Sequence, residues 1–158
     1  MQGTVEPITA SGGGYEQPTV RQFTIFLENR VGKLTKLLSS FAEAGLRVNA
    51  LAVEESADTA LVRVICSDCE IGRGCLRAGD FSFTETNVLA IEVPRDDSQP
   101  LISVCTALLG AEINIHYAYP LLRAKSEPAM ALYVDDITLA CRVLIRRQFK
   151  ILGETDLI

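Results

Sequence analysis

The 158-residue sequence lacks any dense run of lysine and arginine, and its formal net charge is −5. Binding to nucleic-acid phosphates needs concentrated positive charge, so this absence argues against DNA or RNA as the main partner. No apolar run approaches the roughly 18 residues that a membrane-spanning helix needs. Met1 to Pro7 stay polar and do not show the charged-then-apolar pattern of a signal peptide. We therefore expect a soluble, cytoplasmic protein that does not bind a membrane.

Catalytic signatures are also missing from the sequence. We find no nucleophile–base arrangement, glycine-rich phosphate loop or pair of catalytic carboxylates, and His116 is the only histidine. Cys66, Cys69 and Cys75 lie close together in the chain, but metal sites usually take four ligands and His116 is distant in sequence. The five cysteines therefore predict free thiols rather than a disulfide framework, a metal site or a redox site. We expect no enzymatic activity, no cofactor and no metal.

What the sequence does contain is enough apolar material for a core, because 48% of its residues are hydrophobic. Its length suits one ordinary domain or two small ones. Residues 1–18 contain a serine–glycine run and two prolines without apolar periodicity, which predicts an arm that is either flexible or draped over the surface. The remainder reads as two copies of one unit, and we assign a first domain to residues 19–86 and a second to residues 87–158.

The first copy predicts the order strand, helix, strand, strand, helix, strand. Alternation at Phe23, Ile25 and Leu27 indicates the opening strand, and apolar residues at helical spacing follow from Leu34 to Ala42. Gly32 permits a tight loop before this helix. The remaining expected elements are strands at Arg47 to Glu55 and Leu61 to Ile65, a helix capped by Asp68, and a strand at Phe81 to Thr86.

The second copy repeats these six elements, and we match Leu34 with Leu101 and Asn49 with Asn114. A duplication of this kind predicts an α+β fold of two ferredoxin-like units. Each unit would be an antiparallel four-stranded sheet with both helices on one face. The expected elements are strands at Asn87 to Val93, Ile113 to Leu121, Met130 to Val134 and Phe149 to about Thr155, and helices after Pro100 and Asp136.

The segment from Leu27 to Leu51 resembles the opening of an ACT domain, a regulatory fold that binds amino acids in many metabolic enzymes. The resemblance departs from the family pattern where Val31 replaces a proline in the first loop. No glycine occurs in Ser98-Gln99-Pro100 of the second loop, so the second loop is expected to bind less well. The motifs that carry the resemblance are Val31-Gly32-Lys33-Leu34, Leu37-Leu38, Phe41, Ala44-Gly45 and Val48-Asn49, then Leu101, Leu108-Leu109, Ile113-Asn114-Ile115, Asp136 and Ala140.

The loop that leads into the first helix is the candidate binding site. Unpaired N–H groups and the helix dipole favour a carboxylate there, and glycine permits a close approach. Arg30 and Lys33 mark the first loop and Asp96 and Asp97 the second. One loop would bind a carboxylate and the other an ammonium group, unless the basic residues are solvated and the aspartates only cap a helix. The resemblance implies ligand contacts from Asn29, Arg30, Val31, Gly32, Lys33, Leu34, Asn49, Ala50, Leu51, Asp97, Ser98, Gln99, Leu101, Asn114 and Ile115.

The predicted function is non-catalytic sensing of an amino acid or a similar small metabolite, with regulation of a metabolic enzyme in trans. By the same resemblance, the two units are expected to pair side by side and the chain to form a homodimer. The alternative is an assembly module that mediates protein contacts without a ligand. Asn49 and Asn114 are equally compatible with bonding their own backbone. Tyr117 and Tyr119 favour a packing role, and His116 favours a hydrogen-bonded strand position on the opposite face.

Overall fold

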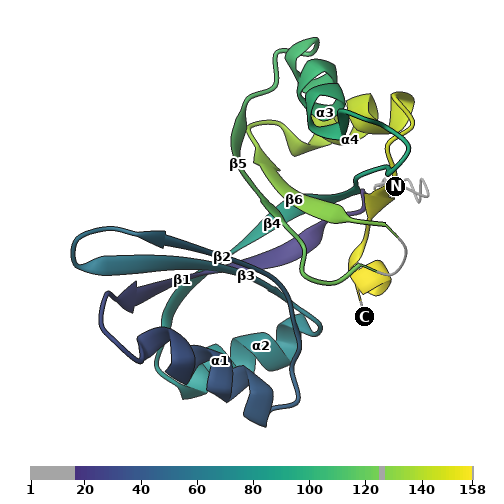
Figure 1. Ribbon diagram of the computed structural model, residues 1–158. Helices are drawn as coiled ribbons and strands as arrows, with labels where there is room; N and C mark the ends of the chain where they lie inside the picture. Colours follow the sequence, from purple (N-terminus) through teal and green to yellow (C-terminus); the bar gives the residue numbers. More distant parts are fainter. Residues whose placement is uncertain (1–16, 125–126, 158) are drawn as a thin grey trace, which may run out of the picture.

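The computed structural model describes residues 17–124 and 127–157, so most of the predicted arm at 1–18 lies outside the described residues. The fold is α+β, as predicted (Figure 1). No helix of the described residues is long and apolar enough to cross a membrane. The elements in chain order are β1 (Val20–Glu28), α1 (Lys33–Glu43), β2 (Val48–Glu55), β3 (Thr59–Cys66), α2 (Cys69–Ala78), β4 (Ser82–Glu92), α3 (Pro100–Leu109), β5 (Ile115–Pro120), β6 (Ala129–Val134), α4 (Ile137–Arg146), β7 (Ile151–Leu152) and the 3-10 helix η1 (Glu154–Leu157).

The first unit is the predicted ferredoxin-like sheet with two helices on one face. Its strands lie in the order β2-β3-β1-β4, and all neighbouring pairs are antiparallel. Alternation along β1 places Phe23, Ile25 and Leu27 in one core with Leu37 and Phe41 of α1. Helices α1 and α2 therefore cover one face of the sheet with their apolar sides.

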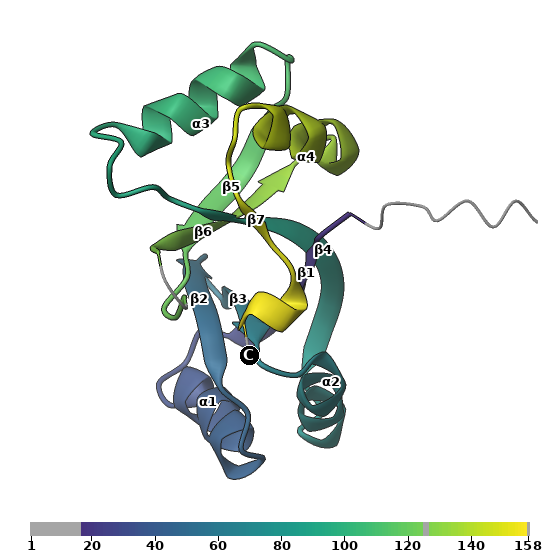
Figure 2. The same cartoon turned by 90° about the vertical axis from the view of Figure 1, so that its right-hand side faces the viewer.

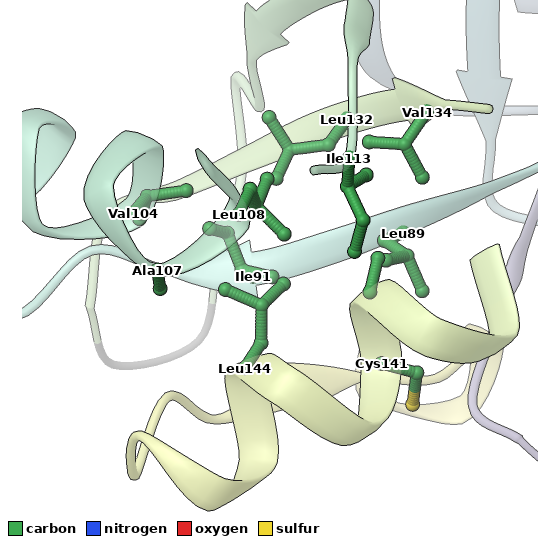
Figure 3. Packing of buried hydrophobic residues seen from close by; sticks show 11 residues of the cluster. Leu89, Ile91, Val104, Ala107, Leu108, Ile113, Leu132, Val134, Cys141 and Leu144 are labelled. Atoms are coloured by element: carbon green, nitrogen blue, oxygen red, sulfur yellow. The ribbon is translucent and has the colours of Figure 1, made fainter. Parts of the chain in front are cut away.

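The second unit repeats the arrangement. Strands β6 and β7 each pair with β4, and β5 pairs with β6 at the edge of the sheet. Figure 3 shows its core, where Val104 and Leu108 of α3 and Leu144 of α4 pack over Leu89 and Ile91 of β4. The final strand is shorter than predicted. It stops at Leu152, because Gly153 N–H donates to Asp156 and the chain turns into η1.

One strand, β4, belongs to both units, which corrects the expectation of separate strands at Phe81 to Thr86 and Asn87 to Val93. Its first part pairs with β1 up to Val88, and its last part pairs with β6 and β7. No turn divides the two parts, and burial becomes continuous at Val88 to Ile91 because both faces are covered there. The two units are thus joined through a single curved strand, visible in Figure 2.

The helix pairs lie on opposite outer sides of the molecule, with the sheets between them (Figure 1). The two units are therefore joined through the shared strand β4, with one helix pair on the outer side of each sheet. A third apolar cluster fills the space between the two sheets because β1, β3 and β4 present small or apolar residues on their second face as well. Its buried members are Val20, Ala50, Ile65, Val88, Ala90, Tyr119, Ala129, Ala131, Leu152 and Leu157.

Candidate ligand site

The loop between β1 and α1 has a left-handed residue at the start of the helix. Gly32 has φ 87° and is the N-cap of α1, and no side chain of the described residues caps this helix. By contrast, Asp68 and Asp136 accept hydrogen bonds from the first N–H groups of α2 and α4. A Cβ on Gly32 would meet nothing within 4 Å, so backbone conformation and not crowding is the reason for glycine here. The start of α1 thus keeps backbone donors without a side-chain partner.

The charges around this loop are partly neutralised. Arg30 Nε lies 2.9 Å from Glu28 Oε2, and Lys33 Nζ lies 4.0 Å from the same oxygen. Asn29 is bonded to the end of β2, where its Nδ2 donates to Glu55 Oε1 at 2.8 Å. Val31 is fully exposed at the tip. Arg30 and Lys33 therefore share the carboxylate of Glu28. This sharing weakens the attraction of the two cations for an anionic ligand, which the sequence had suggested.

The second loop is organised by Asp97. Its Oδ1 accepts from Gln99 N–H at 2.8 Å and its Oδ2 accepts from Ser103 Oγ at 2.7 Å. The bond from the Gln99 N–H, followed by that from Ser103, lowers the pKa of Asp97. Asp97 does not cap α3, which has no side-chain cap hydrogen bond among the described residues; it holds the turn before the helix through Gln99 and Ser103. A hollow of about 590 Å³ adjoins the loop and is lined by Asp96, Asp97 and Arg147 among others.

The two loops do not meet within one chain. The first follows the end of β1, which pairs with the start of β4, whereas the second follows the end of β4. The 11 residues of β4 separate them, roughly 30 Å along an extended strand. Asn49 is also remote from Gly32, because Asn29 contacts Glu55 at the far end of β2. A single intrachain site with one loop for each charge of an amino acid is not formed.

The strand-pairing register shows which residues of the two units occupy equivalent positions, and these differ from the matches expected from the sequence. Gly45 and Glu112, 67 residues apart, both take left-handed backbone angles after the first helix of their unit. The irregularities in the strand pairing that follow contain Asn49 in β2 and His116 in β5, again 67 residues apart. The predicted match of Asn49 with Asn114 is therefore wrong, because the register aligns Asn49 with His116. Asn114 is exposed, and its backbone N–H donates to Asp135 Oδ1.

The remaining predicted contacts of the second unit lie on a different surface. Leu101, Asn114 and Ile115 line a largely apolar hollow of about 500 Å³ beside α3. In the first unit, Leu34 and Leu51 pack against the core beneath α1, and Ala50 is buried between the sheets. The structure thus brings Leu101 and Asn114 together but separates Asn49 from both loops.

Asn49 instead lies at the junction of the two units, where the structure forms a hollow that the sequence did not suggest. The residue is 1% exposed, and its Nδ2 donates to the carbonyl oxygen of Leu157 at 2.7 Å. Its backbone carbonyl accepts from Leu122 N–H, also at 2.7 Å. The alternative in which Asn49 bonds its own backbone does not apply, because its side chain reaches the C-terminal end. The hollow of about 400 Å³ is lined by Arg47, Asn49, Leu122, Arg123, Ala124, Asp156 and Leu157.

A buried polar cluster also joins the units. Gln22 is 0% exposed, and its Nε2 donates to Tyr117 Oη at 2.8 Å and to Thr24 Oγ1 at 3.1 Å. Tyr119 Oη donates to Gln22 Oε1 at 2.6 Å. The Arg63 guanidinium lies 3.8 Å from the centre of the Tyr117 ring. The predicted packing role of both tyrosines is confirmed, and the partner that sequence reasoning missed is Gln22, a polar residue on the second face of a strand.

The cysteines are free thiols, as predicted. Burial raises the pKa of Cys66 to about 11 and, more than any other cause, raises the pKa of Cys69 to about 12. A high pKa keeps a thiol protonated near neutral pH and therefore weakly nucleophilic. Among the described residues, no group of three or more His, Cys, Asp or Glu side chains is placed to hold a metal ion. His116 packs against the Tyr133 ring, with centroids 5.3 Å apart.

Comparisons with known proteins give a consistent assignment. A family model described as "ACT domain pair" matches residues 18–158. Protein BT0572 from Bacteroides thetaiotaomicron has 26% sequence identity and a TM-score of 0.80, covering 88% of this chain and 95% of that chain. The ligand-free regulatory subunit of aspartate kinase from Thermus thermophilus has 12% identity and a TM-score of 0.58, covering 83% and 93%, and shares the fold. No match was found among curated protein sequences.

Proposed function

The chain belongs to the family of ACT domain pairs, and we propose that it is a non-catalytic sensor of an amino acid or similar small metabolite. The observation that carries this proposal is the start of α1, where Gly32 is left-handed and no described side chain caps the helix. Backbone N–H groups at a helix N-terminus bind carboxylates well. In α2 and α4 an aspartate occupies that position and caps the helix, whereas α3, like α1, has no side-chain cap among the described residues. N–H groups at the start of α1 are therefore available to a ligand, whereas an aspartate side chain accepts hydrogen bonds from those of α2 and α4.

A site at this loop needs a second wall, and we propose that a second copy of the chain supplies it. The edge strands β2 and β5 end the sheet and meet one another only near the Ala50–Leu121 bridge, so the rest of each outer edge has no partner strand among the described residues. Beside β5, helix α3 has no charged residue and exposes Leu101, Ile102 and Leu109 by 53%, 61% and 76%. Burying this surface in a homodimer would remove apolar side chains from water.

Regulation would act in trans, on a metabolic enzyme or another regulator. A ligand shifts an equilibrium only through different affinities for its two states. A metabolite held between two copies, or between two units, satisfies this condition because it binds only where both walls are in place. The partner would then recognise the arrangement that the ligand stabilises.

The test is a thermal-shift panel with the twenty amino acids. A ligand present at about 100 times its Kd stabilises the folded state by about 2.7 kcal/mol, which corresponds to a rise of about 5–10 °C in Tm for a chain of this length. Stabilisation by one or a few amino acids supports sensing. A flat panel, together with a stable dimer in light scattering, would instead support the assembly module, which the exposed apolar face of α3 favours.

A further inference from the structure

The hollow at the junction of the two units is built by three separate parts of the chain. Arg47 directly precedes β2 and Asn49 lies at its start, Arg123 comes from the segment after β5, and Asp156 from η1. Its volume of about 400 Å³ falls within the range of small-molecule sites. We infer that this hollow binds an acidic amino acid, with two carboxylates and one ammonium group, and the inference rests on the proposed function.

The charges that line the hollow decide the ligand class. Two guanidinium groups and one carboxylate belong to Arg47, Arg123 and Asp156. Neither arginine forms an ion pair with any described residue. An acidic amino acid carries the complementary set, because its two carboxylates match the arginines and its ammonium group matches the aspartate. A neutral amino acid would leave one guanidinium without a partner.

Asn49 is a buried polar residue that lines the hollow. Its Nδ2 is held by Leu157, whereas its side-chain oxygen has no hydrogen-bond partner among the described residues. An amide oxygen is a suitable acceptor for an ammonium group. Asp156 is itself positioned, because its Oδ2 accepts from Gly153 N–H at 2.8 Å. Two of the polar groups around the hollow are thus fixed before a ligand arrives.

A ligand in this hollow would touch both units and the C-terminal helix η1 at once. The hollow also lies where Leu122 N–H bonds the Asn49 carbonyl, one of the contacts between the two units. Occupancy would therefore favour one relative position of the units over others, which provides the differential affinity that regulation requires.

The test is calorimetric titration of the full chain with aspartate, glutamate, asparagine and glutamine. We expect aspartate or glutamate to bind about tenfold or more tightly than its amide, since a charged hydrogen bond is lost. Arg47→Gln and Arg123→Gln should each weaken binding by about ten- to hundredfold. Arg142→Gln is the matched control, because Arg142 is exposed on α4 and does not line the hollow.

The outcomes separate this inference from the proposed function. If neutral amino acids bind and acidic ones do not, the chain is a sensor but the hollow is not its site. The same conclusion holds if the acidic ligand binds equally well to Arg47→Gln, Arg123→Gln and Arg142→Gln. Equal binding of inorganic phosphate and of the acidic amino acid would also overturn the inference. If no amino acid binds at all, both proposals fail.

Discussion

Asn49 donates a side-chain hydrogen bond of 2.7 Å to the carbonyl oxygen of Leu157, 108 residues further along the chain. The same residue accepts from Leu122 N–H, so the start of β2 is bonded to the segment after β5 and to η1. Both ends of this connection are buried, where an unpaired polar group is costly. Asn49 therefore joins the first unit to two parts of the chain that follow the second unit's strands β5 and β7.

Replacing Asn49 by alanine should lower the free energy of unfolding by about 1–3 kcal/mol, because it leaves the buried Leu157 carbonyl without its donor. Asn114→Ala is the control, since Asn114 is exposed and should stay within about 0.5 kcal/mol of the wild type. Urea denaturation of both variants measures the difference. Equal effects would mean that the hydrogen bond from Asn49 to Leu157 contributes nothing measurable to stability.

Replacing Gly32 by alanine should cost about 1–2 kcal/mol of stability, because φ 87° is unfavourable for a residue with a Cβ. Gly45→Ala is a close match, since Gly45 has φ 71° and its added Cβ also meets nothing within 4 Å. The two variants should therefore lose similar stability in urea denaturation. If the first loop binds ligand, only Gly32→Ala should weaken an amino acid that binds there, as measured by calorimetry. Equal affinities in the two variants would remove the loop from the site.

Replacing Tyr119 by phenylalanine should lower stability by about 1–2 kcal/mol, because Gln22 Oε1 then loses the donor at 2.6 Å. Gln22→Leu removes the other partner, and the double variant completes a mutant cycle. We expect a coupling energy above about 0.5 kcal/mol between the two residues. Additive effects would mean that the hydrogen bond contributes nothing measurable to joining β1 and β5.

Alkaline pH should destabilise the fold through Cys66. Burial raises the pKa of Cys66 from 9.0 to about 11, so the unfolded chain loses this proton first. The stabilisation is complete below pH 9 and is lost as the pH rises from about 9 to 11. Urea denaturation under reducing conditions should therefore show a shallower decline for Cys66→Ala than for the wild type.

The exposed Cys105 provides the control for that measurement. Cys105→Ala should retain the decline of the wild type, since its thiol is not buried. Parallel stability curves for the wild type and Cys66→Ala between pH 9 and 11 would contradict the assignment, whatever their difference at neutral pH.

The sequence predicted the helices and their buried faces because apolar spacing is a local property. Leu37 and Phe41, and likewise Val104 and Leu108, lie in the cores that their spacing indicated. It did not predict that β4 is continuous. In hindsight the apolar run from Val88 to Ile91 is the signal, because a strand covered on both faces loses its alternation.

The junction hollow could not be predicted, because it depends on how the two sheets pack. Arg47, Arg123 and Asp156 are far apart in sequence and share no motif. The match of Asn49 with Asn114 failed for a related reason. Asn49 and Asn114 both follow an apolar residue in the sequence, but the position of the strand irregularity is set by pairing with the neighbouring strand.

The most direct measurement is calorimetric titration of the purified chain with each amino acid. The proposed sensing role predicts saturable binding of at least one amino acid, with heat that disappears when the ligand is already present at saturation. It further predicts that the same ligand protects the chain against thermal unfolding. The absence of saturable heat for all twenty amino acids at millimolar concentration would contradict it.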